Sequence, residues 1–450
     1  MASPQSQRSP LLVAPILPTL LRLSVPNIGA TVAVALVAVI ETIYVGLLGT
    51  EALAGMALVF PMVMLQQMMS AGAMGGGVSS AVSRALGAGD RRRAQALALH
   101  AVVIGLVAGL GFFLFFGLAG GWLYGLLGGS SGAIDEALAY STVFFLAAPS
   151  IWLMNMLTSV VRGTGNMRIP SGTLFVAAGA QLVIGGCMGL GLGPFPRLGM
   201  TGVALGPAIA LTAGAAFLLW YTTAGGSAVR LTVRDVALRW EMFRDILKVG
   251  APACISSLQN VLTIVILTGL VARFGTEALA GYGIGARLEF LLVPTTFAIG
   301  VSCVPLVGMA IGAGDVARAR RVAWTSGALA AVLIGSVGML VALFPGLWVN
   351  WFTDDTAVLE AASLYLRLAG PGYAFFALGL ALYFASQGAG RVIGLVLAGT
   401  LRLALIAGGG WIITAEQAPV TMLFTLVSVT MVVFGLAAAL AIHWTRWERS

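Results

Sequence analysis

The heptapeptide GTEALAG occupies residues 49–55, and the same seven letters return at residues 275–281, 226 positions later. Pro26 and Pro252 are separated by the same distance. Two loops repeat at a spacing of 225 positions, GAGD with itself and RGTG with QGAG (residues 87–90 with 312–315, and 162–165 with 387–390). One spacing held across four segments indicates that the chain is an approximate duplication.

The composition decides the class of protein. The chain has 450 residues, of which 59% are hydrophobic and 9% charged, and its mean hydropathy is +1.00. A soluble domain carries about 25% charged residues because its surface faces water. The composition therefore excludes a soluble protein and predicts an all-α integral membrane protein. The net charge of +8 comes from arginines in short loops between apolar runs, which indicates topology control and not nucleic-acid binding.

Apolar runs divide the chain into spans. A bilayer core of about 30 Å needs about 20 apolar residues per helix. Six spans are expected in each half, so both halves enter the membrane from the same side and form a parallel repeat around a central cavity, as in transporters. We predict lobes at residues 1–221 and 247–450, joined by a cytoplasmic linker at 222–246. The twelve predicted spans are residues 24–47, 54–80, 95–118, 137–160, 171–192, 200–221, 247–271, 280–308, 322–344, 359–386, 392–413 and 420–443.

The basic residues predict the orientation. With a cytoplasmic N-terminus, only two of the 24 lysines and arginines fall in outer loops, Arg197 and Arg273. Four more lie in or at the ends of spans, and the other eighteen lie on the cytoplasmic side (the four are Arg22, Arg287, Arg367 and Arg402). This asymmetry predicts a multi-pass protein with both termini in the cytoplasm.

Several kinds of chemistry lack a sequence signal. The three cysteines and two histidines have no metal-ligand or CxxC spacing, and no GxxxxGK[ST] loop is present. We therefore expect no enzyme, no cofactor beyond a coupling ion, and no direct use of ATP. Asp90 and Asp315 precede predicted helices and are interpreted as their N-caps.

The repeated motifs together resemble those of the multidrug and toxic compound extrusion (MATE) family. The resemblance covers residues 20 to 440 and rests on a proline-bearing first span, an acidic residue before threonine and glycine-rich turns (residues 23–26, 40–46, 49–55, 86–90, 162–166 and 282–289). It implies a monomeric antiporter of the bacterial inner membrane that exports amphipathic, often cationic, organic compounds in exchange for H⁺ or Na⁺.

Two other classes of transporter remain open. A major facilitator-type transporter also has twelve spans in two parallel halves, but residues 89–93 lack the second glycine of that family's loop. A lipid-linked precursor flippase of the same wider superfamily would share the repeat, and such proteins carry more cations in the cavity. Arg287 is the one arginine that we expect at the centre of this chain.

Glu41 is the main candidate for ion coupling. A carboxylate inside a span costs about 2.5 kcal/mol or more, so it usually faces a cavity and has a function. Glu41 lies eight residues before Gly49, about 12 Å of helix, which places it in the outer half of the membrane. At about 100° per residue, one stripe of the first span contains five polar residues: Ser24, Asn27, Thr31, Glu41 and Thr42.

The resemblance assigns further roles. Glu41 stands where the family has an essential carboxylate, usually aspartate, and Pro26 stands where that helix can bend. An asparagine and an aspartate of proton-coupled relatives correspond to Gln181 and Gly185. Carboxylates of sodium-coupled relatives lie near Asn260 and Phe376, and neither residue is acidic here. The coupling ion therefore stays open between H⁺ and Na⁺.

The second half has its own polar groups. Glu41 corresponds to Leu267, while the seventh span carries a stripe of Ser256, Gln259, Asn260 and Thr263. Glu289 is a second candidate coupling group, with Arg287 too close in sequence to face it on a helix. Methionines around Gln66 and Gln67 suit a promiscuous surface, and Tyr373 and Phe376 can stack on flat cations. The predicted cavity lining is Asn27, Thr31, Gln67, Gln181, Gln259, Asn260, Tyr373 and Phe376.

Overall fold

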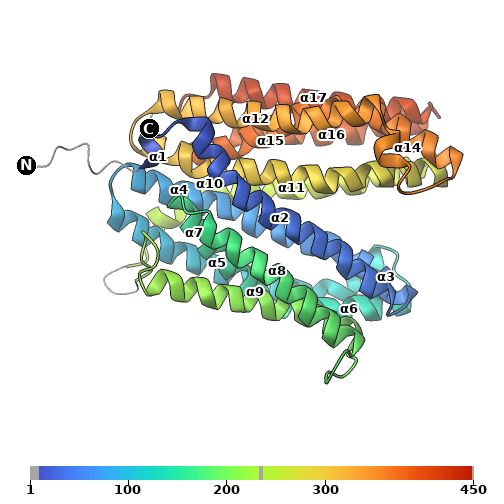
Figure 1. Cartoon of the computed structure of the whole chain (residues 1–450), viewed down its shortest axis with the longest axis horizontal. Coiled ribbons are helices and arrows are strands. Elements are labelled where there is room, and N and C mark those ends of the chain that lie inside the picture. The colour runs from blue at the N-terminus through green and yellow to red at the C-terminus, as the bar shows by residue number, and fades with distance from the viewer. Residues whose placement is uncertain (1–9, 233–236, 448–450) are drawn as a thin grey trace, which may run out of the picture. The chain divides into compact units, whose positions relative to one another are not determined.

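The computed structural model describes residues 10–232 and 237–447, and these residues form helices and no strands. Figure 1 shows the helices as long, roughly parallel rods within each half of the chain. In order they are α1 (Pro10–Val13), α2 (Ile16–Gly46), α3 (Thr50–Gln67), a π-helix (Met68–Met74), α4 (Gly75–Gly87), α5 (Arg91–Leu126), α6 (Ser131–Leu146), α7 (Ala148–Gly163), α8 (Arg168–Leu190), α9 (Gly199–Thr223), α10 (Trp240–Ala272), α11 (Thr276–Gly312), α12 (Val316–Leu343), α13 (Gly346–Val349), α14 (Thr356–Ala369), α15 (Gly372–Ala389), α16 (Ile393–Ala415) and α17 (Val420–Trp444).

The predicted all-α fold with twelve spans is confirmed. Ten helical stretches are long and apolar enough to cross a membrane, and two bent helix pairs complete the twelve. The pair α6 and α7 is bent by 49°, and the pair α14 and α15 by 54°. A proline lies at each bend, Pro149 and Pro371, where a missing N–H favours a break. The bends were not predicted, and neither was the length of α5, which has 36 residues.

The chain divides into two compact units. One, here the N-unit, is residues 25–250, in which α8 packs on α9, α5 on α7 and α3 on α6. The other, the C-unit, contains residue 251 onward together with the chain up to Ser24, and α15 packs there on α11, α12 and α17. The predicted linker includes residues 233–236, which lie outside the described residues, as do Arg8, Arg234 and Arg449 of the topology prediction.

The repeated letters encode repeated turns. Gly49 and Gly275 precede α3 and α11 with φ of 131° and 106°. Gly89 and Gly314 have φ of 79° and 81° in the two GAGD loops. Residues with a Cβ rarely adopt these angles, so the glycines are required by the backbone. The duplication is therefore one of turn geometry as well as of sequence.

Aspartates begin the helices that follow the GAGD loops, as predicted. The Asp90 carboxylate accepts the backbone N–H of Arg93 at 2.8 Å, and Asp315 accepts that of Arg318 at 2.8 Å. Each bond satisfies one of the N–H groups that a helix start leaves without a partner. The two aspartates are structural N-caps.

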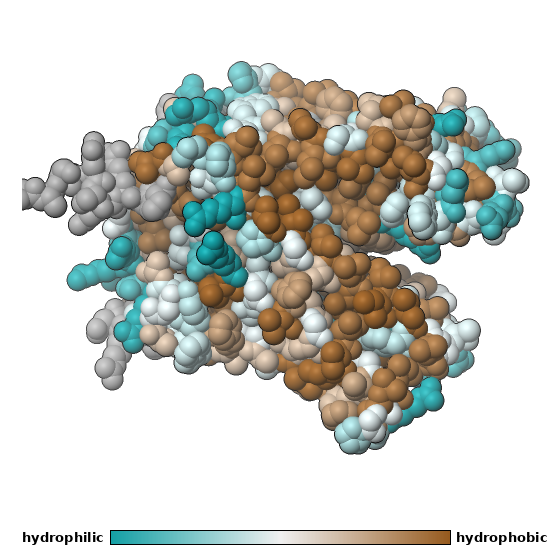
Figure 2. Space-filling model, viewed as in Figure 1, coloured by the Kyte–Doolittle hydropathy of each residue, from teal (hydrophilic) through white to brown (hydrophobic). Residues whose placement is uncertain are grey.

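Large apolar side chains cover the outer faces of the helices. On α5, Leu118 is 87% exposed and Trp122 is 68% exposed. In Figure 2 the apolar residues, drawn in brown, cover most of the visible middle of the helices, while hydrophilic residues gather toward the helix ends. An apolar surface of this extent is the face that a lipid bilayer covers.

Replacing Asp90 or Asp315 by alanine is expected to lower the free energy of unfolding by about 1 kcal/mol, because a helix N–H loses its acceptor. Asparagine at either position keeps an acceptor and is the matched control. Thermal unfolding of the purified protein in detergent measures the difference. Alanine variants that unfold with the wild type would contradict the capping role.

Candidate functional site

Glu41 lies in a buried polar cluster of the N-unit. Its side chain on α2 is 6% exposed. Tyr140 of α6 donates its hydroxyl to Oε1 at 3.5 Å, and Gln181 of α8 donates Nε2 to Oε2 at 3.2 Å. Within residues 10–232 and 237–447, which the structure describes, no arginine or lysine forms an ion pair with Glu41. The carboxylate therefore has neutral hydrogen-bond donors as its partners.

The cluster joins two predicted residues and one that was missed. Glu41 and Gln181 were both candidates, whereas Tyr140 was not, since a single tyrosine in an apolar run carries no distinct signal. Thr42 was expected on the same stripe, but its exposed hydroxyl donates to the Ala38 carbonyl of its own helix. Thr31 likewise donates to carbonyls one turn back.

Tyr44 occupies the space beside Gly185. A Cβ built on Gly185 would lie 3.0 Å from the Tyr44 hydroxyl. That hydroxyl is buried and has no hydrogen-bond partner in the described part of the chain. A larger side chain at position 185 would have to displace Tyr44, which is a physical reason for glycine there.

A buried arginine contacts the first span near Pro26, which lies inside α2. Arg162, in the last turn of α7, is 4% exposed, and its Nη2 donates to Oδ1 of Asn27 at 3.1 Å. The sequence placed Arg162 in a cytoplasmic loop, but the structure buries it at a helix end. Because Asn27 follows Pro26 directly, this bond links the start of the first span to the fourth.

The methionine-rich second span contains a π-helix at Met68–Met74. Asn155 of α7 donates Nδ2 to Oε1 of Gln67 at 3.3 Å and to Oγ of Ser70 at 2.8 Å. Gln66 is fully buried, and its amide has no partner within the described residues. Short π-helical segments inside α-helices, such as the one at Met68–Met74, occur frequently at functional sites. Gln67 is thus held by the fourth span, a contact that its sequence did not indicate.

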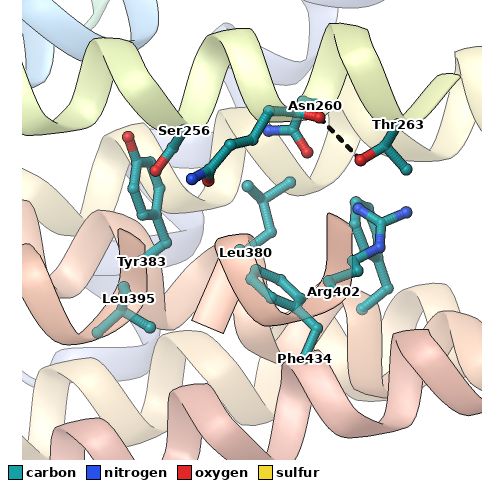
Figure 3. Close-up of a pocket in the computed structure, with 11 residues that line it drawn as sticks. Ser256, Asn260, Thr263, Leu380, Tyr383, Leu395, Arg402 and Phe434 are labelled. Atoms are coloured by element: carbon teal, nitrogen blue, oxygen red, sulfur yellow. Dashed lines mark hydrogen bonds between the residues drawn. The ribbon is translucent and has the colours of Figure 1, made fainter. Parts of the chain in front are cut away.

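A cavity lies within the C-unit. Ser256, Gln259, Asn260 and Thr263 of α10 line one side, so the predicted polar stripe is gathered at one site. Figure 3 shows Asn260 and Thr263 on the upper helix facing Leu380 and the Arg402 side chain. The predicted Phe376 also lines the cavity, together with Phe434. Gln259 donates Nε2 to the Thr400 hydroxyl at 2.7 Å.

Arg402 lies inside the predicted span 392–413, but the sequence analysis singled out Arg287 and not Arg402 as the central arginine. Arg402 lies in the interior of α16 with its guanidinium 4.8 Å from the Phe376 ring centroid and 6.0 Å from that of Phe434. Arg287, which we expected to be the central arginine, is exposed and rests over Phe352 at 5.2 Å. The missed signal was an arginine with apolar residues on both sides in residues 393–415.

Glu289 lines a second cavity of the C-unit. It accepts hydrogen bonds from the hydroxyls of Tyr365 at 2.5 Å and Tyr373 at 3.1 Å. Tyr373 was predicted to stack on a ligand, but its hydroxyl holds this carboxylate. Arg402 and Phe376 line the same cavity.

The fold and these sites define a class: an all-α membrane transporter built from two related six-span units with polar groups inside each. The MatE family profile matches residues 26–185 and 252–407, most of both units. The chain therefore belongs to the MatE family, the multidrug and toxic compound extrusion transporters. This membership excludes the major facilitator alternative.

Related proteins and structures agree with this family. A FAD transporter of Shewanella oneidensis is 27% identical and covers 84% of this chain and 83% of its own length. A probable multidrug resistance protein, NorM, of Thermotoga maritima is 26% identical, and the match covers 83% of this chain and 80% of that protein. The solved structure of a MOP superfamily transporter from Pyrococcus furiosus has 22% identity and a TM-score of 0.88, covering 97% of this chain and 96% of that one. The outward-facing conformation of a MATE transporter has 23% identity and a TM-score of 0.87, with the same coverage.

Replacing Asn27 by leucine is expected to lower the free energy of unfolding by about 3 kcal/mol, because a buried guanidinium loses an acceptor. Combining it with Arg162→Gln should cost less than the two single changes added together, since the stranded charge is gone. Thermal unfolding of the four proteins measures this coupling. If the effects of Asn27→Leu and Arg162→Gln on the free energy of unfolding simply add, the hydrogen bond between Asn27 and Arg162 does not contribute to stability.

Proposed function

We propose that the protein is a secondary antiporter of the bacterial inner membrane, with both termini in the cytoplasm, that exports amphipathic organic compounds, cationic ones included, in exchange for H⁺ or Na⁺. The observation that carries this proposal is Glu41, a buried carboxylate with no basic partner in the described residues. We further propose that it acts as a monomer, needs no cofactor besides the coupling ion, and catalyses no chemical reaction.

The energetic argument concerns the charge of Glu41. A lone carboxylate in the membrane interior is costly, and such residues are retained where function requires them. An arginine would neutralise it permanently, whereas Tyr140 and Gln181 stabilise it only by hydrogen bonds. Its charge can therefore change when a proton or sodium ion binds.

This change in charge gives a transport cycle. Ionised Glu41 attracts a cationic substrate or the ion, and neutral Glu41 does not. If the two facing states bind the ion with different affinity, its gradient moves the equilibrium between them. Pro26 within α2 supplies a place where the first span can bend as the cluster rearranges.

The partners of Glu41 favour the proton over sodium. Both groups that contact its oxygens, a phenol and an amide nitrogen, are hydrogen-bond donors. Sodium would need several oxygen ligands turned toward one point. No cluster of three or more acidic, histidine or cysteine side chains suited to a metal ion occurs in the described residues.

The names of two relatives support a broad range of organic substrates. One relative is a FAD transporter and another a probable multidrug resistance protein. A lipid-linked precursor flippase is the second candidate, because Arg402 places a cation at a cavity where none was expected from the sequence. One arginine is few for such a role, so the antiporter remains the main proposal.

The central test is transport of a fluorescent organic cation into inverted vesicles under an imposed pH or sodium gradient. Wild-type vesicles should take up dye on one gradient, which names the ion. Glu41→Gln keeps the shape and one acceptor oxygen but cannot change charge, so coupled uptake should fall at least tenfold. Thr42→Val, on the same helix, is the control and should transport normally.

Normal uptake by Glu41→Gln would make that residue structural. No dye movement by the wild type on either gradient would contradict the organic-cation proposal and direct attention to the flippase alternative. The two results are separate because the first concerns one residue and the second concerns the substrate.

Glu289 is expected to act as a second coupling group. Glu289→Gln retains acceptors for Tyr365 and Tyr373, so the fold should persist while ion-driven uptake decreases several-fold. Glu289→Leu strands both hydroxyls and should also lower thermal stability by about 1–3 kcal/mol. If glutamine supports full uptake and only leucine is impaired, Glu289 is a structural residue.

A further inference from the structure

The C-unit cavity contains a cation that the proposed transport of cationic compounds does not use. Arg402 lies on the cavity wall among residues of α10, α15 and α17. Within residues 10–232 and 237–447, it takes part in no ion pair, and its buried Nε has no hydrogen-bond partner. An arginine in this position is expensive unless something compensates it.

The acidic side chain that shares a cavity with Arg402 forms no ion pair with it in the described residues. Glu289 lines the second cavity together with Arg402. However, its Oε1 is already held by Tyr365 and Tyr373, and no ion pair joins it to Arg402 in the described chain. The guanidinium therefore rests against ring faces and makes no ion pair with this carboxylate in the described residues, although the two opposite charges attract each other.

Those ring faces orient the guanidinium without occupying its donors. The ring centroids of Phe376 and Phe434 lie 4.8 Å and 6.0 Å from Cζ of Arg402, and the two centroids are 5.9 Å apart. Stacking on aromatic faces leaves the N–H groups at the guanidinium edge available for a planar acid. Figure 3 shows Arg402 with Phe434 on one side and Thr263 on the other, facing the space between the helices.

The rest of the lining suits a flat organic molecule. The cavity has aromatic and aliphatic walls, with Ser256, Gln259 and Asn260 along one side. Small-molecule sites typically combine mostly apolar walls with a few polar groups that fix orientation. The guanidinium suits an acidic group, the phenylalanine rings suit an aromatic ring, and the amides suit further polar atoms. Together they favour an amphipathic aromatic acid as the ligand.

We infer that this cavity is a subsite for the acidic group of an aromatic substrate, with the Arg402 guanidinium binding its carboxylate or equivalent acid and Phe376 and Phe434 contacting its ring. The inference rests on the proposed transport function and deepens it by naming a substrate class.

The test is equilibrium dialysis of the full-length protein in detergent with two matched probes, 2-naphthoate and 2-naphthamide, corrected for uptake by empty micelles. The probes have the same ring, and only the first is an anion. The wild type should bind the naphthoate at least about tenfold more tightly, as expected for a charge-assisted pair. Arg402→Gln should abolish this preference and leave naphthamide binding within about twofold.

Three further variants complete the design. Arg287→Gln, an exposed arginine of the same unit, should behave as the wild type. Phe434→Leu should weaken both probes by a similar factor because it removes a shared ring contact. If Arg402→Gln does not fold, Arg402→Lys keeps the charge but loses the planar fork, and should weaken naphthoate alone by about threefold or more.

A wild type that binds both probes equally, or that binds no naphthoate up to about 1 mM, overturns the inference. So does an Arg402→Gln or Arg402→Lys variant that folds and retains the wild-type preference. Because no ion gradient is present, the result does not depend on coupling. Loss of gradient-driven uptake with an intact naphthoate preference would reject the antiporter and keep the subsite.

Discussion

A charged group inside a bilayer must be compensated by hydrogen bonds, a counter-charge or a change in protonation. Four buried or half-buried ionisable groups in this chain meet that constraint in different ways. Glu41 and Glu289 accept bonds from tyrosine hydroxyls, and Glu41 also from an amide. Arg162 donates to the Asn27 amide oxygen, and Arg402 rests against two phenylalanine rings. None is locked by an ion pair in the described residues. Each can therefore respond to an ion, a substrate or a helix movement.

The duplication repeats the scaffold but not these charges. Both units have a glycine turn before the second span, an aspartate cap after it and a proline-associated bend in the fourth. At the repeat spacing of 226, Glu41 corresponds to Leu267 and Glu289 to Val63, and at the spacing of 225 that holds later in the chain Arg402 corresponds to Ala177. The shared features are those that the backbone needs in order to turn and start helices. The charges differ because packing does not require them, so each unit could acquire its own chemistry.

This distinction explains what could be predicted from the sequence. Twelve spans, the repeated turns and the Asp90 and Asp315 caps were predictable, because apolar length and local turn chemistry depend on nearby residues. Glu41 was named because a carboxylate inside an apolar span stands out in the sequence, and Gln181 because the family resemblance supplied its position. Tyr140, Asn155 and Arg402 were missed or misassigned because their importance comes from helices that are distant in the chain. The choice between Arg287 and Arg402 depends on the rotation of two helices about their axes, which no local pattern specifies.

The two kinds of charge suit different tasks in a transporter. A carboxylate can lose or gain a proton under physiological conditions once its surroundings are adjusted, whereas a guanidinium stays protonated in proteins. Glu41 and Glu289 are therefore suited to register an ion, and Arg402 cannot do so. A permanent cation instead selects among substrates, because it attracts acids and disfavours cations in every state of the cycle. Ion coupling and substrate selection can thus reside on separate residues, and a change in one need not alter the other.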